Sequence, residues 1–168
     1  MLSKNLITDI NEQINFELLS EYLYLSMAAY FEDQNLPGFA NFFKVQVQEE
    51  RFHAMKFFDY LNQMDGRVIL KSIEAPENDF EGALDVFEKS LNHEKKVTKR
   101  IYNLMDVALD EKEHATISLL KWFIDEQVEE EDNFNTLVKK LKRANNDPTL
   151  IYMLNEELSL RVFTPPTL

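Results

Sequence analysis

Long stretches without glycine or proline constrain this sequence more than any other feature. The 168 residues include only three glycines and five prolines, and nearly all of them lie between long segments rather than inside them. Four of these segments carry apolar residues at alternating steps of three and four, which is the spacing of an amphipathic helix. Because proline and glycine end helices, the pattern predicts an all-α fold with four long helices.

Turn and capping signals set the expected limits of the helices. The third helix is predicted to begin at Asp79 or Phe80, and the fourth with a capping box formed by Asp110 and Glu113. Asp147 followed by proline predicts the start of a short fifth helix. The approximate limits expected for the helices and the final tail are 4–33, 37–65, 79–109, 110–144, 148–160 and 161–168.

The connection between the second and third helices is too long for a tight turn. At about 3.3 Å per residue it can span the length of a bundle, since helices of about 30 residues are about 45 Å long. The other connections are short, so the first and second helices, and the third and fourth, are expected to be antiparallel. The prediction is one domain over residues 1–168: a four-helix bundle at about 4–144 with a long crossover and a short C-terminal helix.

Composition limits the partners of the chain. A formal net charge of −12 argues against nucleic acid and favours attraction of cations. The absence of cysteine excludes disulfides, thiolate zinc sites and thiol catalysis. No apolar run has the length of a signal peptide or of a membrane span, so no membrane partner and a cytoplasmic location are expected.

Polar residues interrupt the middle of each predicted core-facing stripe. The interruptions nearest the helix midpoints are Glu17, Glu50, Glu94 and Gln127. Helix midpoints lie at one level of a bundle whichever way the helices run, so these residues are expected to converge. In the third helix the stripe is predicted to consist of Leu84, Phe87, Leu91, Glu94, Thr98, Ile101, Met105 and Ala108.

The two halves of the chain repeat this arrangement. Glu17 and Glu50 are 33 residues apart, as are Glu94 and Gln127. Gln127 and Glu130 have the spacing of Glu50 and His53. The repeat predicts a pseudo-two-fold site built from two similar helix pairs.

Metal ions explain these buried charges better than a polar core does. The four carboxylates are Glu17, Glu50, Glu94 and Glu130, and no lysine or arginine lies on the stripes to neutralise them. Buried carboxylates that meet in one place cannot all stay ionised without cations. Two divalent ions would balance them, and oxygen ligands with the single imidazole of His53 suit iron or manganese, with zinc as a competitor. Any one residue alone could be an ordinary hydrogen-bonded polar residue of the core.

Four segments resemble those of bacterial non-haem ferritins, and the resemblance covers essentially the whole chain. The segments are NEQIN at 11–15, YLYLSM at 22–27, QEERFHA at 48–54 and WFIDEQVEE at 122–130. The resemblance implies a first iron held by Glu17, Glu50 and His53. It implies a second held by Glu50, Glu94 and Glu130, with the amide of Gln127 beside them. It further implies a third position, whose ligands would be Glu49, Glu126, Glu129 and Glu130.

Several of these roles have a simpler alternative. Glu49, Glu126 and Glu129 lie at the border of the stripes, where acidic residues usually form a solvated face. By the resemblance Tyr24 is the tyrosine next to the centre, and it would be either a hydrogen-bonded core residue or a reservoir for one electron. Two histidines are expected to lie outside the centre: His93, and His114 with its preceding Glu111, which are attributed to capping of the fourth helix.

The resemblance implies iron storage with ferroxidase activity: Fe(II) oxidised by O2 or H2O2 and kept as ferric mineral in a shell of twenty-four subunits. The alternatives are a di-iron oxygenase and a DNA-protecting mini-ferritin. Haem, as bound by bacterioferritins, is not expected, because Arg51 stands where they have a methionine ligand. A di-iron oxygenase would typically have a second Glu-x-x-His motif, where this chain has Gln127 and Glu130.

Overall fold

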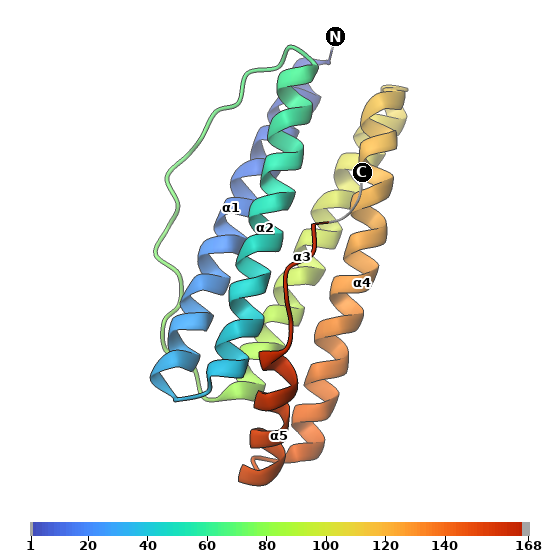
Figure 1. Cartoon of the computed structure of the whole chain (residues 1–168). Helices are drawn as coiled ribbons and strands as arrows, with labels where there is room; N and C mark the ends of the chain where they lie inside the picture. Colours follow the sequence, from blue (N-terminus) through green and yellow to red (C-terminus); the bar gives the residue numbers. More distant parts are fainter. Residues whose placement is uncertain (1, 166–168) are drawn as a thin grey trace. The chain divides into compact units, whose positions relative to one another are not determined.

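The protein is described by a computed structural model in which residues 2–165 are placed; the last three residues of the predicted tail lie outside them. Its five helices are α1 (Lys4–Asp33), α2 (Pro37–Gln63), α3 (Ala83–Asp110), α4 (His114–Ala144) and α5 (Pro148–Ser159), shown in Figure 1. The placed residues form no strand, as predicted. Within them, none of the helices combines the length and apolar character that crossing a bilayer requires.

The chain divides into two compact units, which are described separately. One contains residues 1–10 and 81–145, and therefore α3 and α4. The other contains residues 11–80 and 146–168, and therefore most of α1, all of α2, the crossover and α5.

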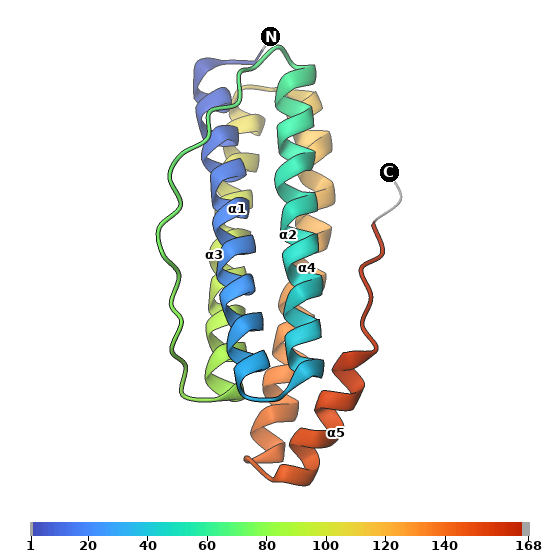
Figure 2. The same cartoon turned by 60° about the vertical axis from the view of Figure 1, so that its left-hand side comes forward.

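An aromatic cluster joins α1 and α2 near the turn that connects them. The two helices run antiparallel (Figure 2), and Asn35 in the turn has a left-handed φ of 56°. The ring of Phe31 stacks on Phe39 and Phe43 with centroid distances of 5.1 and 5.6 Å, and Tyr24 lies 5.7 Å from Phe43. Burial of such rings contributes on the order of 2 kcal/mol each, so this cluster fixes how the two helices face each other.

The crossover is an extended segment that lies along α1 (Figure 2), and side chains of α1 supply its hydrogen bonds. Asn11 accepts from the backbone N–H of Ile69 at 2.6 Å, and Asn15 from that of Lys71 at 2.7 Å. Nearer the other end of α1, the Ser26 hydroxyl donates to the carbonyl of Glu77 at 2.6 Å. These polar side chains satisfy backbone groups that have no strand or helix partner.

The helix α5 packs on the first turn of α2. Asp147 caps α5 by accepting from the N–H groups of Thr149 and Leu150 at 2.9 and 3.0 Å. The buried Asn155 accepts from the N–H of Gly38 at 2.8 Å, one of the donors that a helix start leaves without an intrahelical partner. A Cβ on Gly38 would lie 1.7 Å from the carbonyl oxygen of Asn155, so only glycine permits this approach.

The helices α3 and α4 form the antiparallel pair of the other unit. Phe87 and Phe134 pack between them with a centroid distance of 6.1 Å, and Lys142 pairs with Glu88 at 2.7 Å. The predicted helix limits need two corrections here. The helix α3 begins at Ala83, because Gly82 before it has a φ of 143° that does not continue a helix.

The predicted capping box of α4 is also wrong. Asp110 is the last residue of α3, and Glu113 alone is the N-cap of α4. The Glu113 carboxylate accepts from the backbone N–H of Thr116 at 2.8 Å and from its hydroxyl at 2.7 Å.

The core-facing stripe of α3 differs in phase from the predicted one. Phe87, Glu94, Ile101 and Ala108 are buried as expected. Between them Ser90, His93, Val97 and Leu104 are buried, whereas the predicted Leu84, Leu91, Thr98 and Met105 are only half-buried. Residues three and four positions further along a helix lie on adjacent faces. In α3 apolar residues occur at both positions, so the spacing does not decide which of the two faces the core.

The substitution Gly38→Ala is expected to lower the melting temperature of the protein by about 3–10 °C, because a new Cβ overlaps backbone that cannot move aside cheaply. Thermal unfolding followed by circular dichroism measures the change. Gln63→Ala is the control, since Gln63 is an exposed residue of α2. Equal melting temperatures for the two variants would contradict the proposed packing of α5.

Candidate metal centre

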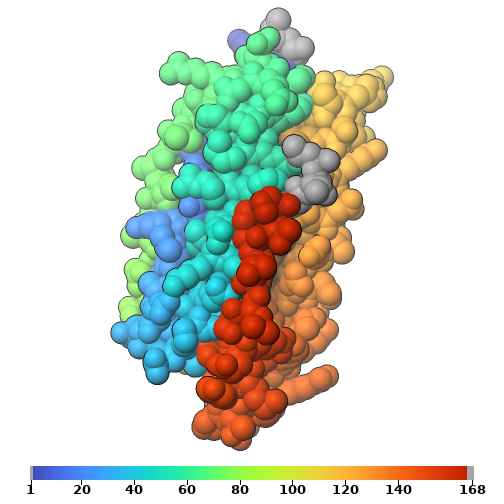
Figure 3. All heavy atoms as spheres, viewed as in Figure 1, coloured from blue at the N-terminus to red at the C-terminus, as the bar shows by residue number. Residues whose placement is uncertain are grey.

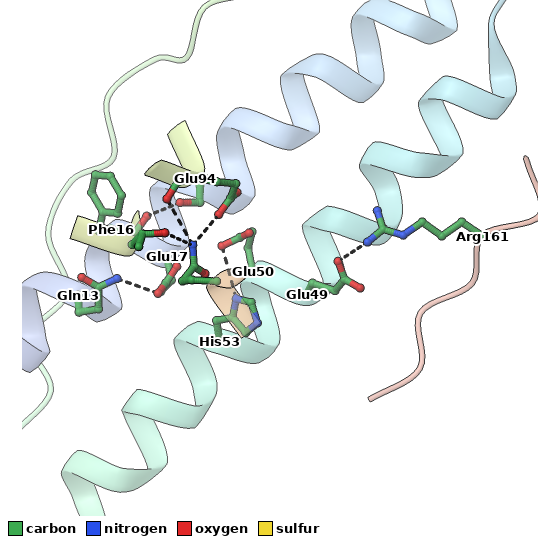
Figure 4. A network of polar contacts seen from close by, with 11 residues as sticks. Gln13, Phe16, Glu17, Glu49, Glu50, His53, Glu94 and Arg161 are labelled. Atoms are coloured by element: carbon green, nitrogen blue, oxygen red, sulfur yellow. Dashed lines mark hydrogen bonds and ion pairs between the residues drawn. The ribbon is translucent and has the colours of Figure 1, made fainter. Parts of the chain in front are cut away.

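Two carboxylates and an imidazole meet at the interior face of α1 and α2. Glu17, Glu50 and His53 are almost fully buried, with 0, 1 and 3% of their surface exposed. One ligand atom from each residue lies within 4.8 Å of those of the other two. Figure 4 shows the three side chains pointing toward one another, as the sequence predicts for the first metal position.

The helices orient these ligands. Glu50 and His53 are three residues apart on one face of α2, and the nearest distance between their Oε2 and Nδ1 atoms is 3.8 Å. Gln13 lies one turn before Glu17 and donates its Nε2 hydrogen to the Glu17 Oε1 atom at 2.8 Å. This contact holds one oxygen of the Glu17 carboxylate in place.

Burial keeps the imidazole of His53 in the form that binds metals. Loss of solvation, and then the positive charge of Lys56, lower the pKa of His53 to about 4. At neutral pH the ring is uncharged and one nitrogen carries a lone pair. A neutral imidazole with two carboxylates is a donor set suited to a divalent iron or manganese ion.

A second buried polar group lies between α3 and α4. Gln127 donates to the Glu94 carboxylate at 3.1 Å and to the Glu94 carbonyl at 3.3 Å, and both residues are nearly fully buried. Glu130, one turn after Gln127, is 5% exposed. Glu94 and Gln127, the pair that the 33-residue repeat singles out, are therefore in contact. The amide of Gln127 donates to the Glu94 carboxylate as the amide of Gln13 donates to that of Glu17.

Sequence reasoning missed the partners that hold the carboxylates. Thr98 accepts from Gln127 at 3.3 Å and donates to Glu131 at 2.6 Å. Thr98 is on the stripe predicted for the third helix, and Gln13 and Thr98 each lie four residues from a predicted ligand. That spacing was the available signal, because residues four apart in a helix are neighbours.

The remaining predicted site residues range from fully buried to exposed. Tyr24 is fully buried against Phe43, which fits a core residue. Glu49 is half-buried and paired with Arg161, whereas Glu126 is half-buried and Glu129 exposed. The third iron position, and the convergence of the α1–α2 ligands with those of α3 and α4, stay predictions.

His114 is the first residue of α4 and is exposed. Glu111 lies just before α4, and therefore outside the helix in which the sequence placed it. Its carboxylate accepts from the Ser3 hydroxyl at 2.8 Å. His93 is buried, and burial followed by the charge of Lys96 lowers its pKa to about 4.

Comparison with known proteins identifies the class to which this chain belongs. Residues 7–144 match the family described as Ferritin-like domain. The bacterial non-heme ferritin of Staphylococcus aureus is 44% identical over 163 residues, which cover 97% of this chain and 98% of that protein. The corresponding protein of Staphylococcus haemolyticus is equally similar, with 44% identity over 163 residues, again 97% of this chain and 98% of that protein. The chain belongs to the ferritin family.

Solved structures support the same conclusion. A humanized archaeal ferritin matches with a TM-score of 0.97 and 45% identity, over 98% of this chain and 100% of that one. An open-pore ferritin from Archaeoglobus fulgidus matches with a TM-score of 0.96 and 44% identity, over 96% of this chain and 100% of that one. The fold class is therefore the ferritin-like four-helix bundle with a short C-terminal helix, as predicted.

Replacing Glu50 by glutamine is expected to stabilise the metal-free protein and to abolish its stabilisation by metal. The amide keeps the shape but removes one of two buried like charges, so the melting temperature should rise by about 2–8 °C. Anaerobic Fe(II) should then add no further increase, as scanning calorimetry can measure. Glu32→Gln is the control, because Glu32 is exposed and pairs with Lys44. A wild-type response of the Glu50 variant to Fe(II) would exclude Glu50 as a ligand.

Proposed function

We propose that the chain oxidises Fe(II) at a two-iron centre and stores the Fe(III) as mineral. The observation that carries this proposal is the buried cluster of Glu17, Glu50 and His53 in a chain of the ferritin family. Iron storage is the function of that family. The ferroxidase reaction and the number of irons go further and are argued from the ligands.

Two irons are expected because of the charge and the number of ligands. Glu17, Glu50 and His53 would hold the first iron, and Glu94 and Glu130 would hold the second with Glu50 as the bridge. The four carboxylates balance two Fe(II) ions, which removes the cost of burying them. Gln13 and Gln127 hold two of these carboxylates by hydrogen bonds at 2.8 and 3.1 Å, so the ligands are oriented before iron arrives.

Oxidation changes the charge that this ligand set must balance. Each Fe(II) gives one electron, and the pair together reduces O2 to H2O2, or H2O2 to water, with protons taken from solvent. The positive charge of the irons rises by two, so four carboxylates no longer balance it. We propose that this excess of positive charge weakens the binding of Fe(III) at the two-iron centre. The Fe(III) would then leave by way of a third position at Glu49, Glu126, Glu129 and Glu130.

Assembly and location complete the proposal. A shell of twenty-four subunits would enclose the mineral, and the acidic chain would attract Fe(II) to it. A cytoplasmic location, and the absence of nucleic acid and membrane partners, follow from composition and family resemblance. Solved relatives described as open-pore and closed forms of a ferritin support assembly into a shell.

Glu130→Ala tests the two-iron centre. Stopped-flow mixing of Fe(II) with the metal-free protein in air should show fast oxidation that saturates at two or three Fe(II) per chain, followed by slower uptake of many more. The variant should oxidise the first irons at least about tenfold more slowly, since it lacks a ligand of the second iron. Glu88→Ala, which removes an exposed carboxylate of α3 paired with Lys142, should behave as wild type.

Two outcomes would count against the proposal. A wild-type oxidation rate in an assembled Glu130 variant would exclude the second iron position. Stoichiometric binding without fast oxidation and without further uptake in the wild-type protein would replace a ferroxidase by a static metal site.

A further inference from the structure

The segment that follows α5 is fastened along α2, which Figure 3 shows from one side. The side-chain amide of Asn41 donates to the backbone carbonyls of Leu158, Ser159 and Arg161 at 3.1, 3.3 and 2.9 Å. These carbonyls lie at the end of α5 and just beyond it, where backbone acceptors lose their regular helical partners; that of Leu158 also accepts from the N–H of Arg161 at 3.3 Å. The contact therefore sets the position from which the Arg161 side chain extends.

The guanidinium group of Arg161 forms an ion pair with a predicted iron ligand. Its Nη2 atom is 2.7 Å from the Oε2 atom of Glu49, as Figure 4 shows. Its Nη1 atom donates to the carbonyl of Phe42 at 3.3 Å, and its Cζ atom lies 4.2 Å from the centre of the Phe42 ring. Both charged side chains are only about one quarter exposed or less, with 21% for Arg161 and 24% for Glu49.

Further along, the ring of Phe163 lies 6.4 Å from that of Phe52. The chain therefore contacts α2 both around the end of α5 and at Phe163, on either side of Arg161 in the sequence. The guanidinium is thus not a freely moving surface charge. An ion pair held in this way loses less side-chain entropy on forming than an exposed pair does.

A guanidinium and an iron ion compete for the same carboxylate. The oxygen of Glu49 that accepts the Arg161 hydrogen has its charge already neutralised, and a positive group within ion-pair distance repels a cation arriving at that carboxylate.

We propose that Arg161 occupies Glu49 while the third iron position is empty and is displaced when iron binds there. Arg161 is then a positioning residue that weakens the third position relative to the first two. Iron leaves a weakened position more readily, so the segment favours passage of iron over its retention. This inference rests on the proposed function, because it takes Glu49 as a ligand of the third position.

Anaerobic calorimetric titration of the assembled, metal-free protein with Fe(II) tests the competition. Arg161→Gln should bind the third Fe(II) at least about threefold more tightly than wild type, which is the effect expected for losing one partly buried ion pair. Arg161→Lys keeps the charge and should stay near the wild-type affinity. Lys44→Gln, which removes a positive charge of α2 paired with Glu32, is the matched control and should change nothing.

Hydrogen exchange measured by mass spectrometry tests the displacement itself. In the wild-type protein the backbone amides of residues 160–164 should exchange faster after the third equivalent of anaerobic Fe(II), and not after the first two. In Arg161→Gln they should exchange faster without iron. Asn41→Ala, which loosens the segment and leaves the charge, should tighten the third Fe(II) by a smaller factor.

The outcomes separate this inference from the proposed function. Unchanged third-site affinity in Arg161→Gln, or an unchanged exchange rate on iron binding, would overturn the competition while the first two sites still filled and oxidised Fe(II). Failure of the wild-type protein to bind the first two Fe(II) would instead overturn the proposed function, and with it this inference.

Discussion

Burial of carboxylates in an apolar interior is the constraint on which the rest of this structure depends. Glu17 and Glu50 are at most 1% exposed and lie in a cluster whose ligand atoms are within 4.8 Å of one another. Several kcal/mol oppose such burial unless cations or hydrogen bonds compensate it. The chain supplies the hydrogen bonds through Gln13, and again between Gln127 and Glu94 in the other unit. In the proposed function, bound iron ions would supply the remaining compensation, so the metal-free protein is expected to be less stable than the loaded one.

Rigid surroundings let such a centre persist without metal. Stacked rings of Phe31, Phe39 and Phe43 fix α1 against α2 on one side of the ligands. The crossover is tied along α1 by asparagine side chains, and α5 approaches α2 through the one glycine that permits it. The same end of the chain then brings Arg161 to Glu49. The C-terminal part of the chain therefore contributes both to the packing on α2 and to the charge beside Glu49.

The helices and the residues of the α1–α2 cluster could be predicted from the sequence, because their spacing is local. Lys4 and Asp33 were predicted as the limits of α1, and both are its ends. The phase of the α3 stripe could not be predicted, since the buried Ser90, Val97 and Leu104 and their neighbours one position further along both include polar and apolar side chains. The ion pair of Arg161 and Glu49 joins residues 112 apart and leaves no local pattern. The proposed acidic ligands could be predicted from the sequence because charge is rare on a buried face.

The central claim is that the α1–α2 ligands and those of α3 and α4 form a single two-iron centre. Crystals of the protein soaked anaerobically with Fe(II) and measured at the iron absorption edge test it most directly. The account predicts two anomalous peaks about 3.5–4 Å apart, one bound by Glu17, Glu50 and His53 and the other by Glu50, Glu94 and Glu130. A single peak at the α1–α2 ligands, or a second iron bound without Glu94 and Glu130, would contradict it.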